Sequence, residues 1–306
     1  MIDPLLFLQQ TLNGLQLGVM LFLMAAGLTL VFGIMDFINL AHGSFYMLGA
    51  YVTAWLVGLT DAFLPSLAGA LLLTALVALA VEVTVAKRLY RSDHLYQVLA
   101  TFGLILFFNE AIKLAFGPQP LFLRTPSWLD GQVPLFGAPY PLVRLAVIAA
   151  GLASALLLWW LVGRTRIGMW IRAGADDREI IQALGIDIGR VFALVFALGA
   201  ALAALAGAMA GMLLAVRIGM GEEILILTFV VIVVGGIGSI RGAFLGALLV
   251  GLVDTWGRAF LPDLLALVMS RPRADAAGAA MAPIAIYLLM AVVLALRPRG
   301  LLPARS

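Results

Sequence analysis

Long stretches without a charged side chain decide what this sequence can fold into. No Asp, Glu, Lys or Arg occurs in residues 4–35, and several later apolar runs are nearly as long. A helix needs about 20 apolar residues to cross the hydrocarbon core of a bilayer. Only 11% of the residues are charged and 64% are hydrophobic, whereas a soluble domain carries about a quarter charged residues. The sequence therefore predicts an integral membrane protein.

The membrane-crossing segments are predicted to be helices. The sequence lacks the short segments of alternating polar and apolar residues that build a membrane β-barrel. We expect an all-α, polytopic transmembrane helical bundle of about eight to nine membrane segments, including possible half-helices, in a single domain. That domain covers residues 1–306, with segments at residues 8–34, 45–59, 66–86, 95–116, 144–163, 191–216, 224–234, 243–261 and 281–296.

Three of the connections have a distinctive composition. Residues 117–143 contain six prolines together with Trp128 and Tyr140, which predicts an irregular external loop with aromatic side chains at the interface. Residues 164–190 are rich in charge and form the expected cytoplasmic loop. A Pro- and Ala-rich loop is expected up to residue 280.

The cations predict how the protein is oriented. Lys87, Arg88, Arg91, the arginines of residues 164–190 and those near the C-terminus fall on one predicted side. Because Lys and Arg are enriched in cytoplasmic loops, we assign that side to the cytoplasm and the N-terminus to the outside. The net charge of +3 comes with cations that flank membrane segments, so the expected partner is membrane lipid and not nucleic acid.

Residues 164–190 also carry the signals of a short helix. Asp176 or Asp177 is a candidate N-cap, Glu179 has a capping-box spacing to Asp176, and Gly185 can end the helix. Such a helix has about two turns and is too short to be stable alone in water. Its apolar edge is predicted to comprise Ile180, Ile181 and Leu184, with Arg178 and Gln182 facing elsewhere. Two interpretations are open: an ordinary interfacial loop, or a contact that transmits motion from a partner protein.

Two breaks interrupt the apolar runs, at residues 36–44 and 234–242. Interrupted membrane helices in corresponding positions are typical of transport pathways, and polar groups inside a bilayer indicate function. If the first break lies at the membrane interface instead, Asn39 and Ser44 would cap the helix that follows. The candidate pathway residues are Asp36, Asn39, His42 and Ser44 in the first break, and Gly235, Gly236, Gly238 and Ser239 in the second.

Acidic residues within the predicted segments have cations close by in sequence. Glu110 and Lys113 are three residues apart, and Asp254 and Arg258 are four apart, so each pair is predicted to form a local ion pair. Glu82 is predicted to be neutralised by the nearby cations Lys87 and Arg88.

Small residues recur along two of the predicted segments. Gly199, Ala203, Gly207 and Gly211 are spaced by four, and so are Gly238, Gly242 and Gly246. Such faces let helices approach closely, either within one chain or between two subunits.

The sequence contains no pattern for catalysis. It lacks a phosphate-binding G-x-x-x-x-G-K, a G-x-S-x-G and an H-E-x-x-H motif, and it has no cysteine. We therefore expect no catalytic residue, no cofactor and no metal site. If ATP drives this protein, another polypeptide must hydrolyse it.

Three blocks of the sequence resemble one family, the permease subunits of branched-chain amino-acid ABC importers. The blocks are residues 27–51 (GLTLVFGIMDFINLAHGSFYMLGAY), residues 172–207 (RAGADDREIIQALGIDIGRVFALVFALGAALAALAG) and residues 234–246 (VGGIGSIRGAFLG). They occur in the family's order and sample the whole chain. One departure is Asp36, where asparagine is more usual.

The resemblance implies a function and an assembly. It implies translocation of branched-chain or related amino acids across the bacterial inner membrane, with a periplasmic binding protein, a second permease subunit and two cytoplasmic ATPases as partners. It also implies that residues 173–185 form a coupling helix on an ATPase, with Ala173, Asp176, Asp177, Arg178, Glu179, Ile180, Gln182, Leu184 and Gly185 at the contact. Urea, amides or another small solute could use the same fold, and a self-sufficient secondary transporter is a further alternative.

Overall fold

The computed structural model describes residues 3–135, 137–176 and 178–303. Its first helix, α1 (Pro4–Met35), begins where the Asp3 carboxylate accepts a hydrogen bond from the Leu5 backbone N–H at 3.0 Å. Pro4 suits the first helical position because its missing N–H would have no partner there. The helix ends at Asp36, whose backbone is left-handed with a φ of 50°.

Seven helices of the described residues are long and apolar enough to cross a membrane. Two more, α2 (His42–Thr60) and α10 (Met220–Gly235), complete the bundle but are too polar or too short to meet that standard. The expected all-α bundle is thereby confirmed, with a helix at each of the nine expected segments. Besides α1, the seven are the continuous α3 (Phe63–Val81), η1 (Glu82–Ala86) and α4 (Lys87–Leu89), then α5 (His94–Phe116), α6 (Leu142–Arg164), α9 (Ile188–Gly211), α11 (Ile240–Leu265) and α12 (Arg271–Leu296).

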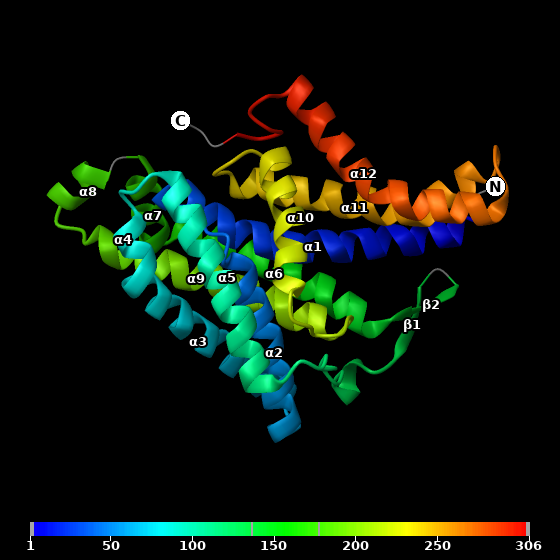
Figure 1. Ribbon diagram of the computed structural model, residues 1–306, viewed down its shortest axis with the longest axis horizontal. Helices are drawn as coiled ribbons and strands as arrows, with labels where there is room; N and C mark the ends of the chain where they lie inside the picture. Colours follow the sequence, from blue (N-terminus) through cyan, green and yellow to red (C-terminus); the bar gives the residue numbers. More distant parts are fainter. Residues whose placement is uncertain (1–2, 136, 177, 304–306) are drawn as a thin grey trace.

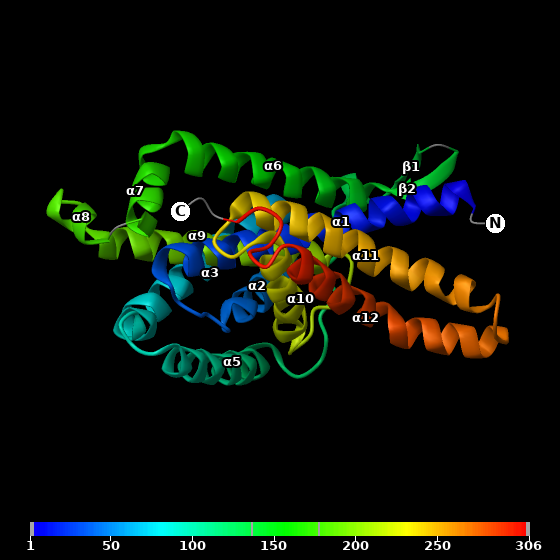
Figure 2. The same ribbon diagram turned by 90° about the horizontal axis from the view of Figure 1, so that it is seen from above.

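Helices α1 and α9 form the centre of the bundle. In the most apolar 18-residue stretch of each helix, 83% of the residues are buried in α1 and 67% in α9. The same share is only 17% to 22% in the helices α3, α5, α6 and α12. Figures 1 and 2 show α1 running beside α11, while α2 and α3 pack against α9. The outer helices present leucines and phenylalanines to their surroundings, as helices in contact with lipid do.

Glycines let the central helices approach one another closely. A Cβ added at Gly27 of α1 would lie 2.7 Å from the Gly199 carbonyl oxygen of α9. A Cβ at Gly246 of α11 would lie 2.7 Å from the carbonyl oxygen of Val231 in α10. The small-residue faces are therefore used for packing within this chain.

The loop at residues 117–143 is more ordered than the sequence indicates. It contains a 3₁₀ turn, η2 (Ser127–Leu129), and an antiparallel hairpin of β1 (Gln132–Leu135) and β2 (Ala138–Pro141). The expectation of a wholly irregular loop is wrong, because three of the six prolines, Pro134, Pro139 and Pro141, lie on a two-stranded ribbon, where few backbone N–H groups need a partner. Figures 1 and 2 place this hairpin at the same end as the N-terminus.

The last two helices are longer than expected. Residues 271–280, expected to belong to a loop, form the first turns of α12. Pro272 occupies its first turn, where proline is tolerated, and the alanines that follow are strong helix formers. Only residues 266–270 connect α11 to α12.

Candidate functional site

The first break separates one exposed polar residue from three buried ones. Asp36 caps α1 and is exposed, and its carboxylate lies 4.0 Å from Nε2 of His94. Asparagine and aspartate both tolerate the left-handed backbone found here, so the departure at Asp36 conserves the turn. Asn39, His42 and Ser44 are each 2% exposed or less.

The buried residues do not cap helix α2. Its N-cap is Ala41, and no side chain bonds the first turn, so the capping interpretation of Asn39 and Ser44 is wrong. Instead, both side-chain polar atoms of Asn39 and Nε2 of His42 lack a hydrogen-bond partner within the described chain. An unpaired buried polar group costs about 1–3 kcal/mol.

Glycine makes the space in which the histidine lies. The His42 ring sits 3.0 Å from where a Cβ of Gly27 would be. The same glycine faces Gly199 across the α1–α9 contact. His42 is thereby buried against α1, at the level where α1 meets α9.

The second break is a compact turn closed by the C-terminal residues. Gly236 and Gly238 have φ angles of 111° and 79°, and Ser239 Oγ accepts a hydrogen bond from the Gly242 N–H at 3.0 Å to start α11. The N–H groups of Leu301 and Leu302 donate to the carbonyls of Val234 and Gly235, each at 2.9 Å. Two carbonyls at the end of α10 thus obtain partners that the helix itself cannot supply.

Helix α10 connects the two breaks. At its first turn Gly221 packs against Gly43, beside the buried residues of the first break. At its last turn lies Gly235, the first glycine of the second break. Gly238 in turn packs against Gly33 at the end of α1. The structure thus brings the second break to the end of α1 but places His42 and Ser44 at the opposite end of α10.

The charged residues 164–190 form two helices, where one was expected. Helix α7 (Arg166–Asp176) follows a sharp corner after α6, where Thr165 Oγ1 accepts from the Gly168 N–H at 3.1 Å. Helix α8 (Arg178–Ala183) is shorter and ends at Gly185, whose φ of 82° confirms the predicted left-handed stop. The short helix predicted between Asp176 or Asp177 and Gly185 corresponds to α8, whereas a single helix over residues 173–185 is wrong because residues 173–176 belong to α7. Asp177 and the side chains of Asp176, Arg178 and Glu179 lie outside the described part.

The faces of these two helices divide between the bundle and the surroundings. Ile171 of α7 is 2% exposed and Ile181 of α8 is 5% exposed, so both face inward. Ile180 is 58% exposed and Leu184 is 72% exposed. The predicted apolar edge is therefore split, with Ile181 anchored and the other two turned outward. Ala173 is half-buried, whereas Gln182 is exposed. Figures 1 and 2 show α7 and α8 at the end of the molecule opposite the β-hairpin.

The acidic residues in the membrane helices have mostly the predicted partners. The ion pairs Lys113–Glu110, at 3.3 Å, and Arg258–Asp254, at 2.9 Å, are confirmed. Glu82 instead accepts a hydrogen bond from the Tyr90 hydroxyl at 2.8 Å, so its predicted pairing with Lys87 and Arg88 is wrong. Burial, followed by the hydrogen bond to Glu82 and its charge, raises the pKa of Tyr90, so this phenol stays a neutral donor.

This architecture defines a multi-pass membrane protein whose central helices pack closely through glycine. Residues 10–296 match the profile of the family described as branched-chain amino acid transport system / permease component, and the chain belongs to that family. The family and the seven membrane-length helices confirm the expected location in the bacterial inner membrane.

Individual relatives cover nearly the whole chain. The permease protein BraD of the high-affinity branched-chain amino acid transport system of Pseudomonas aeruginosa is 29% identical over 97% of this chain and 95% of its own length. The corresponding protein LivH of Salmonella typhimurium is 30% identical over 84% of this chain and 88% of its own, and LivH of Escherichia coli K12 is 29% identical over the same shares. Among solved structures, PsaBC from Streptococcus pneumoniae in complex with Fab matches over 95% of both chains, with 13% identity and a TM-score of 0.47.

Proposed function

We propose that this chain is the permease subunit of an ATP-driven importer that translocates branched-chain or related amino acids. The observation that carries the proposal is the family match over residues 10–296, together with relatives named for branched-chain amino acid transport. The proposed partners are a second permease subunit, two cytoplasmic ATPases and a periplasmic binding protein that delivers the solute. The end that carries α7 and α8 faces the cytoplasm, because the densest cations lie there.

The pair α7–α8 is the proposed contact with an ATPase. The exposed Leu184 and Ile180 offer apolar side chains at the tip of the molecule, as helix-in-groove recognition requires. The inward Ile171 and Ile181 tie both helices to the bundle. A push on α8 is therefore passed to α6, which leads into α7, and to α9, which follows α8.

The buried residues of the first break are proposed to line the solute pathway. The unpaired polar atoms of Asn39 and His42 make the bundle less stable in this arrangement. Water or a polar solute that reaches them in another conformation would supply the missing hydrogen bonds. Ser44 lies one turn into α2 on the same pathway, and Asp36 lies at its cytoplasmic mouth.

The second break is proposed as the element that yields when the pathway opens. Gly235, Gly236, Gly238 and Ser239 join α10 to α11 through a turn that only glycine adopts readily. Movement of α10 at this hinge would shift its first turn, which packs on Gly43 beside the buried polar residues.

Co-purification tests the proposed coupling. Tagged full-length protein, expressed with the proposed partner subunits, is expected to retain a P-loop ATPase, and Leu184→Asp is expected to lose it because a charge replaces an apolar contact. Leu267→Asp is the matched control, since Leu267 is 81% exposed in the α11–α12 connection at the other end. If the Leu184→Asp variant inserts normally and still retains the ATPase, α8 is not part of the contact.

A further inference from the structure

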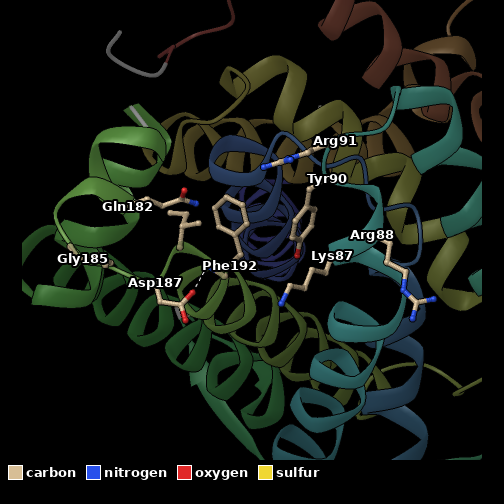
Figure 3. Close-up of a pocket in the computed structure, with 11 residues that line it drawn as sticks. Lys87, Arg88, Tyr90, Arg91, Gln182, Gly185, Asp187 and Phe192 are labelled. Atoms are coloured by element: carbon tan, nitrogen blue, oxygen red, sulfur yellow. Dashed lines mark hydrogen bonds between the residues drawn. The ribbon is translucent and has the colours of Figure 1, made fainter.

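An open cleft lies at the inner end of the third membrane helix, outside the elements assigned to the pathway. Its volume is about 840 Å³. One wall is formed by Lys87, Tyr90 and Arg91, at and just after α4, and the other by Gln182, Asp187 and Phe192 around the α8–α9 connection. Figure 3 shows the cationic groups of Lys87 and Arg91 directed toward the facing wall, whereas Arg88 points away.

The cations of this cleft have no carboxylate partner among the residues that the structure describes. Lys87, Arg88 and Arg91 are exposed and form no ion pair with any described residue. Two acidic groups at the cleft that the structure describes are engaged elsewhere. Asp187 pairs with Arg190 at 3.0 Å and caps α9, and Glu82 holds the Tyr90 hydroxyl.

At the opposite end of the molecule, most cations form ion pairs. There, most have a carboxylate close by, at 3.3 Å for Lys113, 2.6 Å for Arg217, 2.9 Å for Arg258 and 2.7 Å for Arg271. Neighbouring positive charges that have no counter-charge among the described residues raise the local potential and attract anions. The cleft is therefore expected to attract an anionic group of another molecule.

The surroundings of the cleft fit a lipid better than a soluble ion. Its floor is apolar, since the Tyr90 and Phe192 rings meet edge to face with centroids 5.3 Å apart. Next to it, large apolar side chains are exposed at the start of α5, with Leu95 at 72% and Leu99 at 66%. The π-helix η1 exposes Val83 at 59%. A volume of about 840 Å³ also exceeds what one phosphate ion needs, since a water molecule takes about 30 Å³ of liquid.

We propose that this cleft binds the phosphate headgroup of an anionic phospholipid of the cytoplasmic leaflet. Lys87 and Arg91 contact the phosphodiester oxygens, and the acyl chains run outside along the exposed face of α5. Basic pockets between membrane helices on the cytoplasmic side are suited to such headgroups. The proposal rests on the cytoplasmic orientation of α4 but not on the identity of the transported solute or on an ATPase.

The test is lipid binding by the purified full-length chain in a nonionic detergent at low ionic strength. Phosphatidylglycerol, phosphatidylcholine and inorganic phosphate are titrated separately, and the shift in melting temperature gives an apparent Kd for each. The variant is Lys87→Gln with Arg91→Gln. The charge-matched control is Arg124→Gln with Arg273→Gln, two exposed arginines at the other side for which no ion pair occurs among the described residues. Arg88→Gln is a second control, since Figure 3 shows the Arg88 guanidinium directed away from the facing wall, although Arg88 lines the cleft.

The expected result is selective loss of lipid binding. The wild-type chain and both controls bind phosphatidylglycerol at least tenfold more tightly than phosphatidylcholine, and the double variant loses roughly tenfold or more in that affinity. An unchanged affinity in the double variant overturns the site. If inorganic phosphate alone stabilises the protein as much as phosphatidylglycerol does, the ligand of the cleft is a soluble anion and not a lipid. A variant that binds lipid normally but no longer retains the ATPase makes the cleft a protein contact.

Discussion

At the scale of single residues, the close packing of the helices depends on glycine, and the candidate pathway is inferred from buried polar groups without partners. Gly27 gives space both to the Gly199 carbonyl and to the His42 ring, so one position serves a helix contact and the candidate pathway. By contrast, both side-chain polar atoms of Asn39 and Nε2 of His42 are buried without a hydrogen-bond partner in the described chain. The first feature concerns packing, whereas the second is the basis on which Asn39 and His42 are proposed to line the pathway.

We predict that Gly27→Ala destabilises the protein. The new methyl group would lie 2.7 Å from a backbone oxygen of α9, so the two central helices would have to separate. Overpacking of this kind costs about 1–3 kcal/mol. Gly103→Ala in α5 is the control, because nothing lies within 4 Å of its Cβ position. Thermal unfolding in detergent should show a lower melting temperature for the first variant and an equal or higher one for the second.

Asn39→Leu is expected to separate stability from transport. Replacing an unpaired buried amide by an apolar group of similar shape removes a desolvation cost, so the melting temperature should stay equal or rise. If Asn39 lines the pathway, uptake by the assembled importer should fall at least tenfold. A variant that is as stable as the wild type and transports normally would return Asn39 to a purely structural role.

At the scale of elements, the sequence predicted what depends on apolar length and missed what depends on contact. Helices α1, α5 and α9 lie close to the expected segments, because about 20 apolar residues suffice to predict a membrane helix. Helix α7 was missed, although Ile167, Ile171 and Gly174 follow a helical period that could have revealed it. The burial of Asn39 and the bonds of Leu301 and Leu302 to α10 join distant parts of the chain, and no local pattern encodes them.

The C-terminal residues are predicted to stabilise the second break. Gly300 has a φ of 83°, and a Cβ there would lie 2.5 Å from the Gly236 backbone, so Gly300→Ala should displace the Leu301 and Leu302 hydrogen bonds. Losing partners for two buried carbonyls costs about 1–3 kcal/mol each. Gly117→Ala is the control, since Gly117 has the same φ of 83° but open space at its Cβ. In a thermal melt, equal destabilisation by both variants would mean that only backbone strain matters.

At the scale of the whole molecule, the account joins three regions that are far apart in the chain. The charged pair α7–α8 lies at one end, the buried polar residues of the first break lie beside the central helices, and α10 connects that break to the glycine turn. The family match covers all three regions. In the function proposed here, the first region receives force from the ATPase, the second passes the solute and the glycine turn is the hinge.

Uptake by reconstituted proteoliposomes is the most direct test of this account. The chain is reconstituted with the proposed second permease and ATPases, and labelled leucine is supplied with the binding protein and ATP on the appropriate sides. We expect leucine uptake that requires ATP and stops when any one partner is omitted. Uptake of urea is measured in the same way for comparison. Uptake by this chain alone, driven by an ion gradient without ATP, would contradict the account.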